Sequence, residues 1–127
     1  SHLSPCTHVL KEVIKDTHFP NRMQIFAAFG RFTARLHEQG ILHADYSMGN
    51  ILFEPTAKGA TFQLVDLNRM RFGQRINCRK GCRNFERIDT DSHAPSTIAR
   101  AYAQTRGYNE EECVRLVLKM RWRKHKK

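Results

Sequence analysis

With 127 residues, the chain is long enough for one domain with a modest hydrophobic core. Lys and Arg number 22 against 12 Asp and Glu, and the net charge of +10 favours anionic partners such as a nucleotide, a phosphorylated glycolipid, an acidic membrane surface or a nucleic acid. The apolar runs are far shorter than the roughly 20 residues of a membrane span, and the N-terminus lacks a signal pattern. We therefore expect a cytoplasmic protein, with a place at the inner face of the membrane as an option.

The first third of the chain predicts two helices. An apolar pattern between residues 9 and 14 favours a short helix, which Phe19-Pro20 ends. Between Asn21 and Gln39 apolar residues recur at spacings of three and four, which predicts a long amphipathic helix with Gly40 at its C-cap.

Polar residues gather in the next stretch, His-Ala-Asp-Tyr-Ser-Met-Gly-Asn at positions 43–50. Residues 51–53 and 61–65 then have the composition of two strands, and turn residues lie around Lys58-Gly59. Such a hairpin places Asn50, before its first strand, and Asp66, after its second, at the same end. Amide and carboxylate oxygens suit a hard cation, so the two residues could share one magnesium ion.

The remainder of the chain predicts helices. A basic, polar segment extends to Arg83 and is followed by a brief helix at residues 84–88, with Phe85 and Ile88 facing inward. Two longer helices follow at about 96–106 and 110–124, and the second begins with a capping box of Asn109 and Glu112. The expected fold is mainly α with a small β-hairpin (α+β), in a single domain over residues 1–127.

The pattern His43-x-Asp45-x-x-x-x-Asn50, followed by a hairpin and Val65-Asp66, resembles the catalytic loop and metal-binding segment of kinase-like phosphotransferases. With Gly49-Asn50 and Asp66-Leu67-Asn68-Arg69, it resembles most the lipopolysaccharide kinases, which phosphorylate Kdo or heptose sugars of the bacterial outer-membrane core. The resemblance covers roughly residues 21–107, with the catalytic loop at 43–50 and the metal-binding Asp segment at 64–69. It implies the C-terminal lobe of a protein-kinase-like fold.

The resemblance also implies roles for individual residues. Asp45 would position or deprotonate the acceptor hydroxyl, while Asn50 and Asp66 would hold Mg²⁺ against the phosphates of ATP. For His43 a scaffolding role, holding the loop by hydrogen bonds, is favoured over proton transfer.

Nearby residues bear on the acceptor. Ala44 and Ser47 stand where many protein kinases have an Arg and a Lys, which favours a small-molecule or glycolipid acceptor. Arg69 and Arg71 could bind phosphate or an anionic sugar, or could form a solvated basic edge, and both interpretations stay open.

Two other features have weaker functional interpretations. The cationic tail from Arg121 to Lys127 is best interpreted as solvated charge. The alternative is that the tail contacts an acidic membrane surface, with Trp122 at the interface. The four cysteines do not form a disulfide framework, and Cys78 and Cys82 lack a second pair at zinc-finger spacing, so reduced thiols without a metal are expected.

The sequence contains neither a G-x-G-x-x-G loop nor a Lys in a Val-Ala-Ile-Lys-like context. We therefore expect a C-terminal piece of a longer kinase, without its N-terminal lobe, inactive by itself and exposing an apolar surface toward the missing lobe. The expected parent activity is ATP- and Mg²⁺-dependent phosphorylation of a hydroxyl on a lipopolysaccharide core sugar. The alternatives are a catalytically inactive kinase-like interaction module and, ranked last, a basic nucleic-acid-binding domain.

Overall fold

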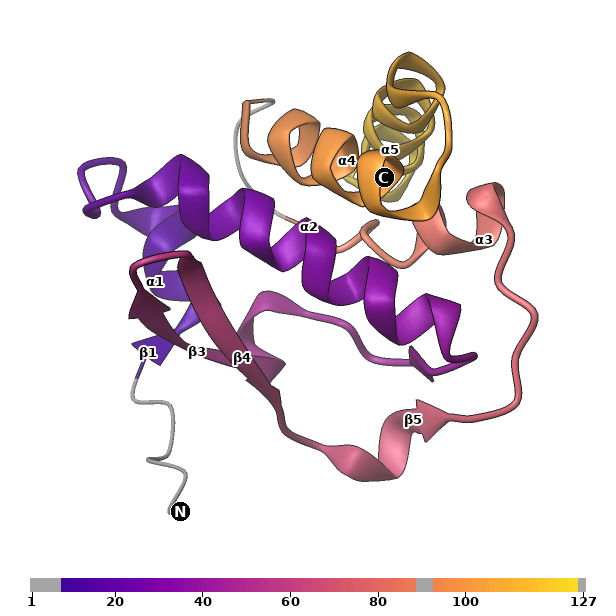
Figure 1. Ribbon diagram of the computed structural model, residues 1–127, viewed down its shortest axis with the longest axis horizontal. Helices are drawn as coiled ribbons and strands as arrows, with labels where there is room; N and C mark the ends of the chain where they lie inside the picture. Colours follow the sequence, from indigo (N-terminus) through magenta and orange to yellow (C-terminus); the bar gives the residue numbers. More distant parts are fainter. Residues whose placement is uncertain (1–7, 89–92, 126–127) are drawn as a thin grey trace.

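The computed structural model describes residues 8–88 and 93–125, with side chains as far as Arg121. The described chain is mainly α with small antiparallel sheets, which confirms the predicted fold class. Its helices and strands follow one another as β1 His8–Val9, α1 Leu10–Lys15, α2 Arg22–Glu38, β2 Leu42–His43, β3 Ile51–Thr56, β4 Gly59–Leu64, β5 Met70–Arg71, α3 Cys78–Arg83, α4 His93–Arg106 and α5 Glu110–His125 (Figure 1).

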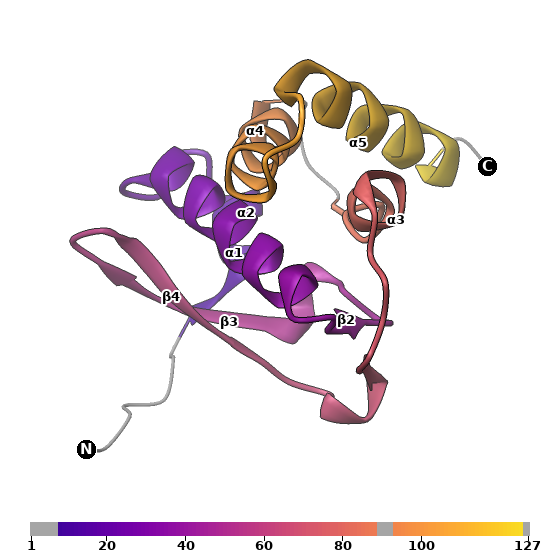
Figure 2. The same ribbon diagram turned by 45° about the vertical axis from the view of Figure 1, so that its right-hand side comes forward.

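Helix α2 is the central element of the fold. It lies between the β3–β4 hairpin on one side and α4 on the other, and α5 packs against α4 and α3 (Figures 1 and 2). The two long helices approach closely at Gly30, because a Cβ atom there would overlap the carbonyl oxygen of Ile98 on α4. Both faces of α2 are therefore covered, and its apolar residues Ile25, Phe26 and Phe29 are fully buried.

Two small antiparallel sheets accompany the helices. One has the strand order β1-β3-β4, and Ile51 pairs with Leu64 at the end of the hairpin that faces the catalytic loop. The hairpin is longer than predicted because Pro55 and Thr56 pair with Ala60 and Gly59, which confines the turn to two residues. The second sheet pairs β2 with β5, a pairing that the sequence analysis did not foresee.

The segment from residue 78 to residue 88 corrects the sequence analysis. The helix α3 spans Cys78–Arg83, inside the stretch expected to be a polar loop, and the brief helix predicted at 84–88 is a series of turns. Asn77 explains the earlier start, because its side-chain oxygen accepts a hydrogen bond from the Lys80 N–H at 2.8 Å and so caps the helix. Phe85 and Ile88 are fully buried, as predicted.

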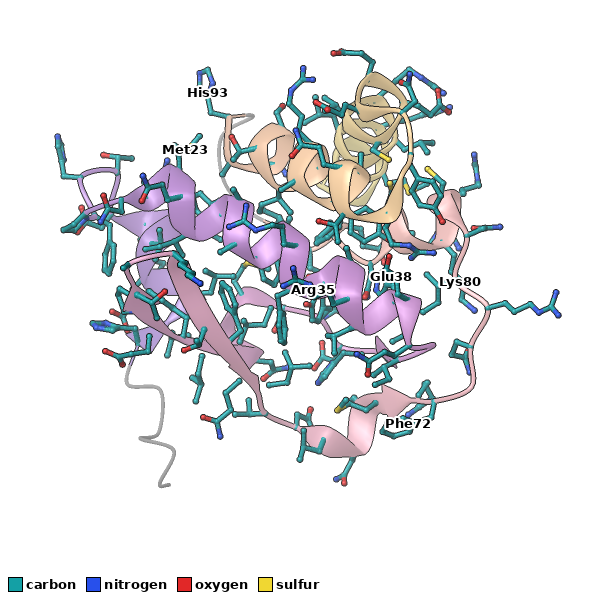
Figure 3. All side chains as sticks on the ribbon, viewed as in Figure 1. Met23, Arg35, Glu38, Phe72, Lys80 and His93 are labelled. Atoms are coloured by element: carbon teal, nitrogen blue, oxygen red, sulfur yellow. The ribbon has the colours of Figure 1, made fainter. Side chains whose placement is uncertain are left out.

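Few large apolar side chains are exposed in the described residues, and two of them flank the segment after Asp66. Leu67 is 64% exposed and Phe72 is 66% exposed. Phe72 lies beside β5 at the outer edge of the molecule (Figure 3). None of the described helices is long and apolar enough to span a bilayer.

Candidate functional site

His43 fixes the conformation of the catalytic loop. It is 1% exposed, and its Nδ1 accepts a hydrogen bond from the Asp45 N–H at 3.1 Å. The ring proton is therefore on Nε2, which donates to the carbonyl of Val65 at 2.9 Å. Both ring nitrogens are used within the protein, which leaves neither of them to exchange a proton with a substrate.

Asp45 and Asn50 are in direct contact. The Asn50 side-chain N–H₂ donates to the Asp45 backbone carbonyl at 3.0 Å and to its carboxylate Oδ2 at 3.2 Å. Asn50 is therefore oriented with its Oδ1 directed away from Asp45, and within the described residues this oxygen accepts no hydrogen bond. The Asp45 side chain is 30% exposed, so a substrate hydroxyl can reach it.

Backbone hydrogen bonds hold the segment that carries Asp66 next to the loop that carries Asp45 and Asn50. The Val65 N–H donates to the Asn50 carbonyl at 3.0 Å, and the Ala44 N–H donates to the Arg69 carbonyl at 2.8 Å. These two bonds and the β2–β5 pairing hold residues 65–71 against the catalytic loop. The two sequence-distant segments are thus brought together, as the hairpin argument required.

The conformation of Asp66 is unusual. Its φ of 60° and ψ of 54° are left-handed, a region that costs free energy for a non-glycine residue and is found preferentially at functional sites. Its carboxylate does not cap the short 3₁₀ helix that follows, and the nearest cation is Arg69, with 4.0 Å between Nε and Oδ2. From the sequence, the apolar Leu64 and Val65 make a solvated position for Asp66 unlikely. This expectation is wrong, because both residues are only half-buried and Asp66 is exposed.

Of the two other predicted supporting residues, Ser47 lies within the loop and Arg71 lies on the exposed segment after Asp66. Ser47 is half-buried beside Asp45, and its carbonyl accepts the Asn50 N–H at 3.0 Å. Arg71 is exposed and donates to the carbonyls of Asn68 and Met70, at 3.2 and 3.4 Å, so its guanidinium is turned toward its own segment.

Arg87 is a site residue that the sequence analysis missed. Its Nη1 donates to the Asp45 Oδ1 at 2.7 Å, so the two carboxylate oxygens have different partners, Arg87 and Asn50. The two residues of this ion pair are 42 positions apart in the chain, and no spacing rule joins them.

Two cavities with basic linings flank the catalytic loop. The first, of about 290 Å³, is lined by Lys11 and Lys15 of α1, Ser47, and Arg87. The second, of about 540 Å³, lies between Ala44 and α3, and its cationic lining residues are Arg79, Lys80 and Arg83. The formal charge of the chain is thus concentrated in part at hollows that adjoin Asp45.

A buried hydrogen-bond network supports the loop from behind. His37 on α2 binds the Tyr102 hydroxyl of α4 at 2.6 Å and the Asn84 Oδ1 at 2.9 Å, and Asn84 in turn donates to the His43 carbonyl at 3.1 Å. Arg106 donates to the Tyr102 hydroxyl at 2.9 Å. Burial lowers the pKa of His37 to about 4, so the ring is neutral at physiological pH.

The side-chain oxygens of Asn50 and Asp66 are of the kind that magnesium ions bind in proteins. The amide nitrogen of Asn50 is occupied by Asp45, which directs the amide oxygen outward, and the Asp66 carboxylate is not used as a helix cap. A hard cation that keeps several waters and nucleotide phosphates as ligands needs only one or two such protein oxygens. The two residues are therefore candidate Mg²⁺ ligands, on segments that lie side by side and next to the Asp45 carboxylate.

The chain matches the model of a known protein family over most of its length. The model of the lipopolysaccharide kinase (Kdo/WaaP) family matches residues 8–108, which is well over half of the chain and includes the catalytic loop, the hairpin and Asp66. No curated protein matches the chain.

Proposed function

Because the chain belongs to the lipopolysaccharide kinase (Kdo/WaaP) family, a family of kinase-type phosphotransferases, we propose that it transfers the γ-phosphoryl group of ATP to a hydroxyl of a lipopolysaccharide core sugar, Kdo or heptose. The observation that carries this proposal is the contact between Asp45 and Asn50 at the point where residues 65–71 pair with the catalytic loop. This is where a phosphotransferase needs a carboxylate beside its metal ligands.

Asp45 orients the acceptor hydroxyl and accepts its proton during transfer. Its carboxylate is held by Asn50 on one oxygen and by Arg87 on the other, so its direction is fixed before substrate binds. Each carboxylate oxygen can still accept a further hydrogen bond, from the acceptor hydroxyl.

Asn50 and Asp66 hold the metal in this proposal. Bound Mg²⁺ would neutralise charge on the phosphates of ATP. The strained backbone of Asp66 directs its carboxylate outward at the edge of the catalytic loop, and the ladder bond from Val65 to Asn50 keeps the two ligands at a fixed separation. His43 ties both to the core through Val65 and Asp45.

An anionic acceptor suits the cavity beside Asp45. Lys11, Lys15 and Arg87 line this cavity, and lysine and arginine bind phosphate and carboxylate groups through charge-assisted hydrogen bonds. A core sugar that carries a carboxylate or a phosphate would place its charge among these residues and its hydroxyl at Asp45. The donor ATP and the glycolipid acceptor together favour a site at the cytoplasmic face of the membrane.

In this assignment the chain supplies the C-terminal lobe of the kinase, with the long helix α2 bracing the catalytic loop. Leu67, within the segment that carries Asp66, and Phe72, just after β5, are exposed apolar residues that a nucleotide-covering lobe could cover. Such a lobe would bring the phosphate-covering loop and the nucleotide-binding Lys. We propose that phosphoryl transfer requires this second lobe and that residues 1–127 alone do not catalyse the reaction.

The test is phosphoryl transfer from radiolabelled ATP to purified core oligosaccharide, catalysed by the intact protein. We expect Mg²⁺-dependent transfer, and a loss on the order of 10²- to 10⁴-fold in Asp45→Asn. Asp16→Asn is the control: the Asp16 carboxylate is exposed and accepts a hydrogen bond from the His18 N–H two residues away, so its loss should leave transfer unchanged. Nucleotide binding without transfer would favour the inactive interaction module, and full transfer by Asp45→Asn would remove the assigned role.

A further inference from the structure

Three cysteines converge where α3 packs against α5. Cys78 and Cys82 lie one helical turn apart on α3, and Cys113 comes from the first turns of α5. Their three sulfur atoms all lie within 4.8 Å of one another, and the Cys78 and Cys113 sulfurs are 3.5 Å apart. Sequence spacing does not reveal this cluster, because Cys113 lies 31 residues beyond Cys82 along the chain.

The separations match those of a thiolate-bound metal. Zn–S bonds of about 2.3 Å with tetrahedral angles place the sulfur ligands about 3.8 Å apart. Sulfurs at 3.5 to 4.8 Å reach this spacing by small side-chain rotations, without a shift of either helix. Cys82 and Cys113 are buried and Cys78 is half-buried, so the cluster is enclosed on two sides and open to an incoming ion on the third.

Other functions of the cluster agree less well with the surroundings. A nucleophilic cysteine needs a lowered pKa, whereas burial raises the pKa of the Cys82 thiol and raises that of Cys113 to about 12. A disulfide between Cys78 and Cys113 would use two sulfurs and leave the third unexplained. Packing alone does not require three adjacent thiols from two separate helices.

We propose that Cys78, Cys82 and Cys113 bind a thiophilic d¹⁰ cation, Zn²⁺, and that this ion ties α3 to α5. Each thiol loses its proton to solvent as its sulfur binds, and water takes the fourth position. A bound ion would fix the position of α3, which leads directly into Asn84 and Arg87, and these two residues hold the His43 carbonyl and the Asp45 carboxylate. The inference does not depend on the phosphotransferase assignment.

The experiment measures the metal content of the whole chain, purified under reducing conditions without chelator. We expect one zinc per chain by elemental mass spectrometry. After removal of zinc, Co²⁺ added to the apoprotein should produce the near-ultraviolet charge-transfer absorption of a thiolate-bound cobalt ion. The midpoint of thermal unfolding should fall on chelation and recover when Zn²⁺ is added back.

Variants locate the ligands. Cys78→Ser replaces the most accessible sulfur and should weaken Zn²⁺ binding by at least about 10-fold while the chain stays folded. His18→Gln removes an exposed imidazole, another potential zinc ligand, in the turn between α1 and α2, and should leave Zn²⁺ affinity unchanged. A wild-type protein that neither contains zinc nor gives the cobalt–thiolate absorption would overturn the proposal, as would isolation of a metal-free Cys78–Cys113 disulfide from reducing conditions.

Discussion

Arg87 is the residue in the site with two possible uses. It fixes one oxygen of Asp45, and it lines the basic cavity with Lys11 and Lys15. Because both the residue and its partner are partly exposed, the pair itself stabilises the fold little. In the proposed function, Arg87 instead contributes the positive charge that it presents next to the acceptor hydroxyl.

The Arg87→Gln variant should therefore bind an anionic acceptor less well. We expect KM for the acceptor to rise about 10-fold, the equivalent of one charge-assisted hydrogen bond, with a smaller change in kcat. Steady-state kinetics of the intact protein measure both constants. Lys58→Gln, in the exposed hairpin turn, is the matched loss of charge and should change neither. A fall in kcat at constant KM would show that Arg87 only positions Asp45.

His37 makes stability depend on pH. Its pKa is about 4 in the folded protein against 6.5 for an ordinary histidine, chiefly because of burial, so the unfolded chain binds the extra proton first as pH falls. The contribution of His37 to the free energy of unfolding should therefore be fully present above pH 6.5. It should decrease by about 3 kcal/mol as the pH falls from 6.5 to 4.

Urea unfolding at a series of pH values measures this contribution. His37→Gln, which keeps a polar group beside Asn84 and Tyr102, should show a smaller loss of stability across the same interval. The other histidines remain in both proteins, so the difference between the two curves isolates His37. Curves with equal slopes would contradict the assignment.

At the scale of elements, we expect the close crossing of α2 and α4 to fix where the loop at residues 43–50 lies, because α2 leads into this loop. Gly30 allows the crossing, because any larger side chain would meet the backbone of Ile98, which cannot move aside as a side chain can. Gly30→Ala should therefore lower the free energy of unfolding by about 1–3 kcal/mol, even though alanine is the better helix former.

Chemical denaturation measures the free energy of unfolding of Gly30→Ala and of the control Gly49→Ala. At position 49 an added Cβ atom meets nothing within 4 Å. The control should be close to neutral. Equal stabilities for the two variants would mean that the helices separate without cost, and the crossing would then not constrain the loop.

Sequence predicted the elements whose signals are local. The period of α2, the hairpin and the last two helices follow from apolar spacing, turn residues and caps, although α4 begins at His93, three residues before the predicted start. Helix α3 was missed because its basic composition outweighed the cap at Asn77. The β2–β5 pairing depends on register between segments far apart, which no local pattern reports.

The site divides in the same way. Asp45 and Asn50 were both singled out from the sequence, and they lie close together because both belong to one short loop. Arg87, Cys113 and the His37–Asn84 network were missed because each contact joins residues more than 30 positions apart. The exposure of Asp66 was misjudged, since the apolar residues before it lie at the end of a strand that is only half-buried.

At the scale of the whole molecule, the net charge of +10 should act on substrate binding. Fields from exposed charges are screened beyond about 10 Å at 0.1 M salt, so raising the ionic strength should weaken binding of an anionic core sugar. A heptose acceptor that carries neither phosphate nor carboxylate is neutral and should bind with little salt dependence. Isothermal titration at several salt concentrations compares the two ligands, and identical slopes would mean that charge does not select the acceptor.

The account depends most on Asp45, Asn50 and Asp66 forming one site, and metal binding tests this directly. Mn²⁺ can replace Mg²⁺ as a paramagnetic probe, and its affinity for the intact protein in the presence of ATP can be followed by electron paramagnetic resonance. Loss of residues that merely support a metal ligand costs about 10- to 100-fold in affinity, so Asp66→Asn and Asn50→Ala should each cost at least about 10-fold. Asp16→Asn should bind Mn²⁺ like the wild type. Unchanged Mn²⁺ affinity in the Asn50→Ala/Asp66→Asn double variant would contradict the account.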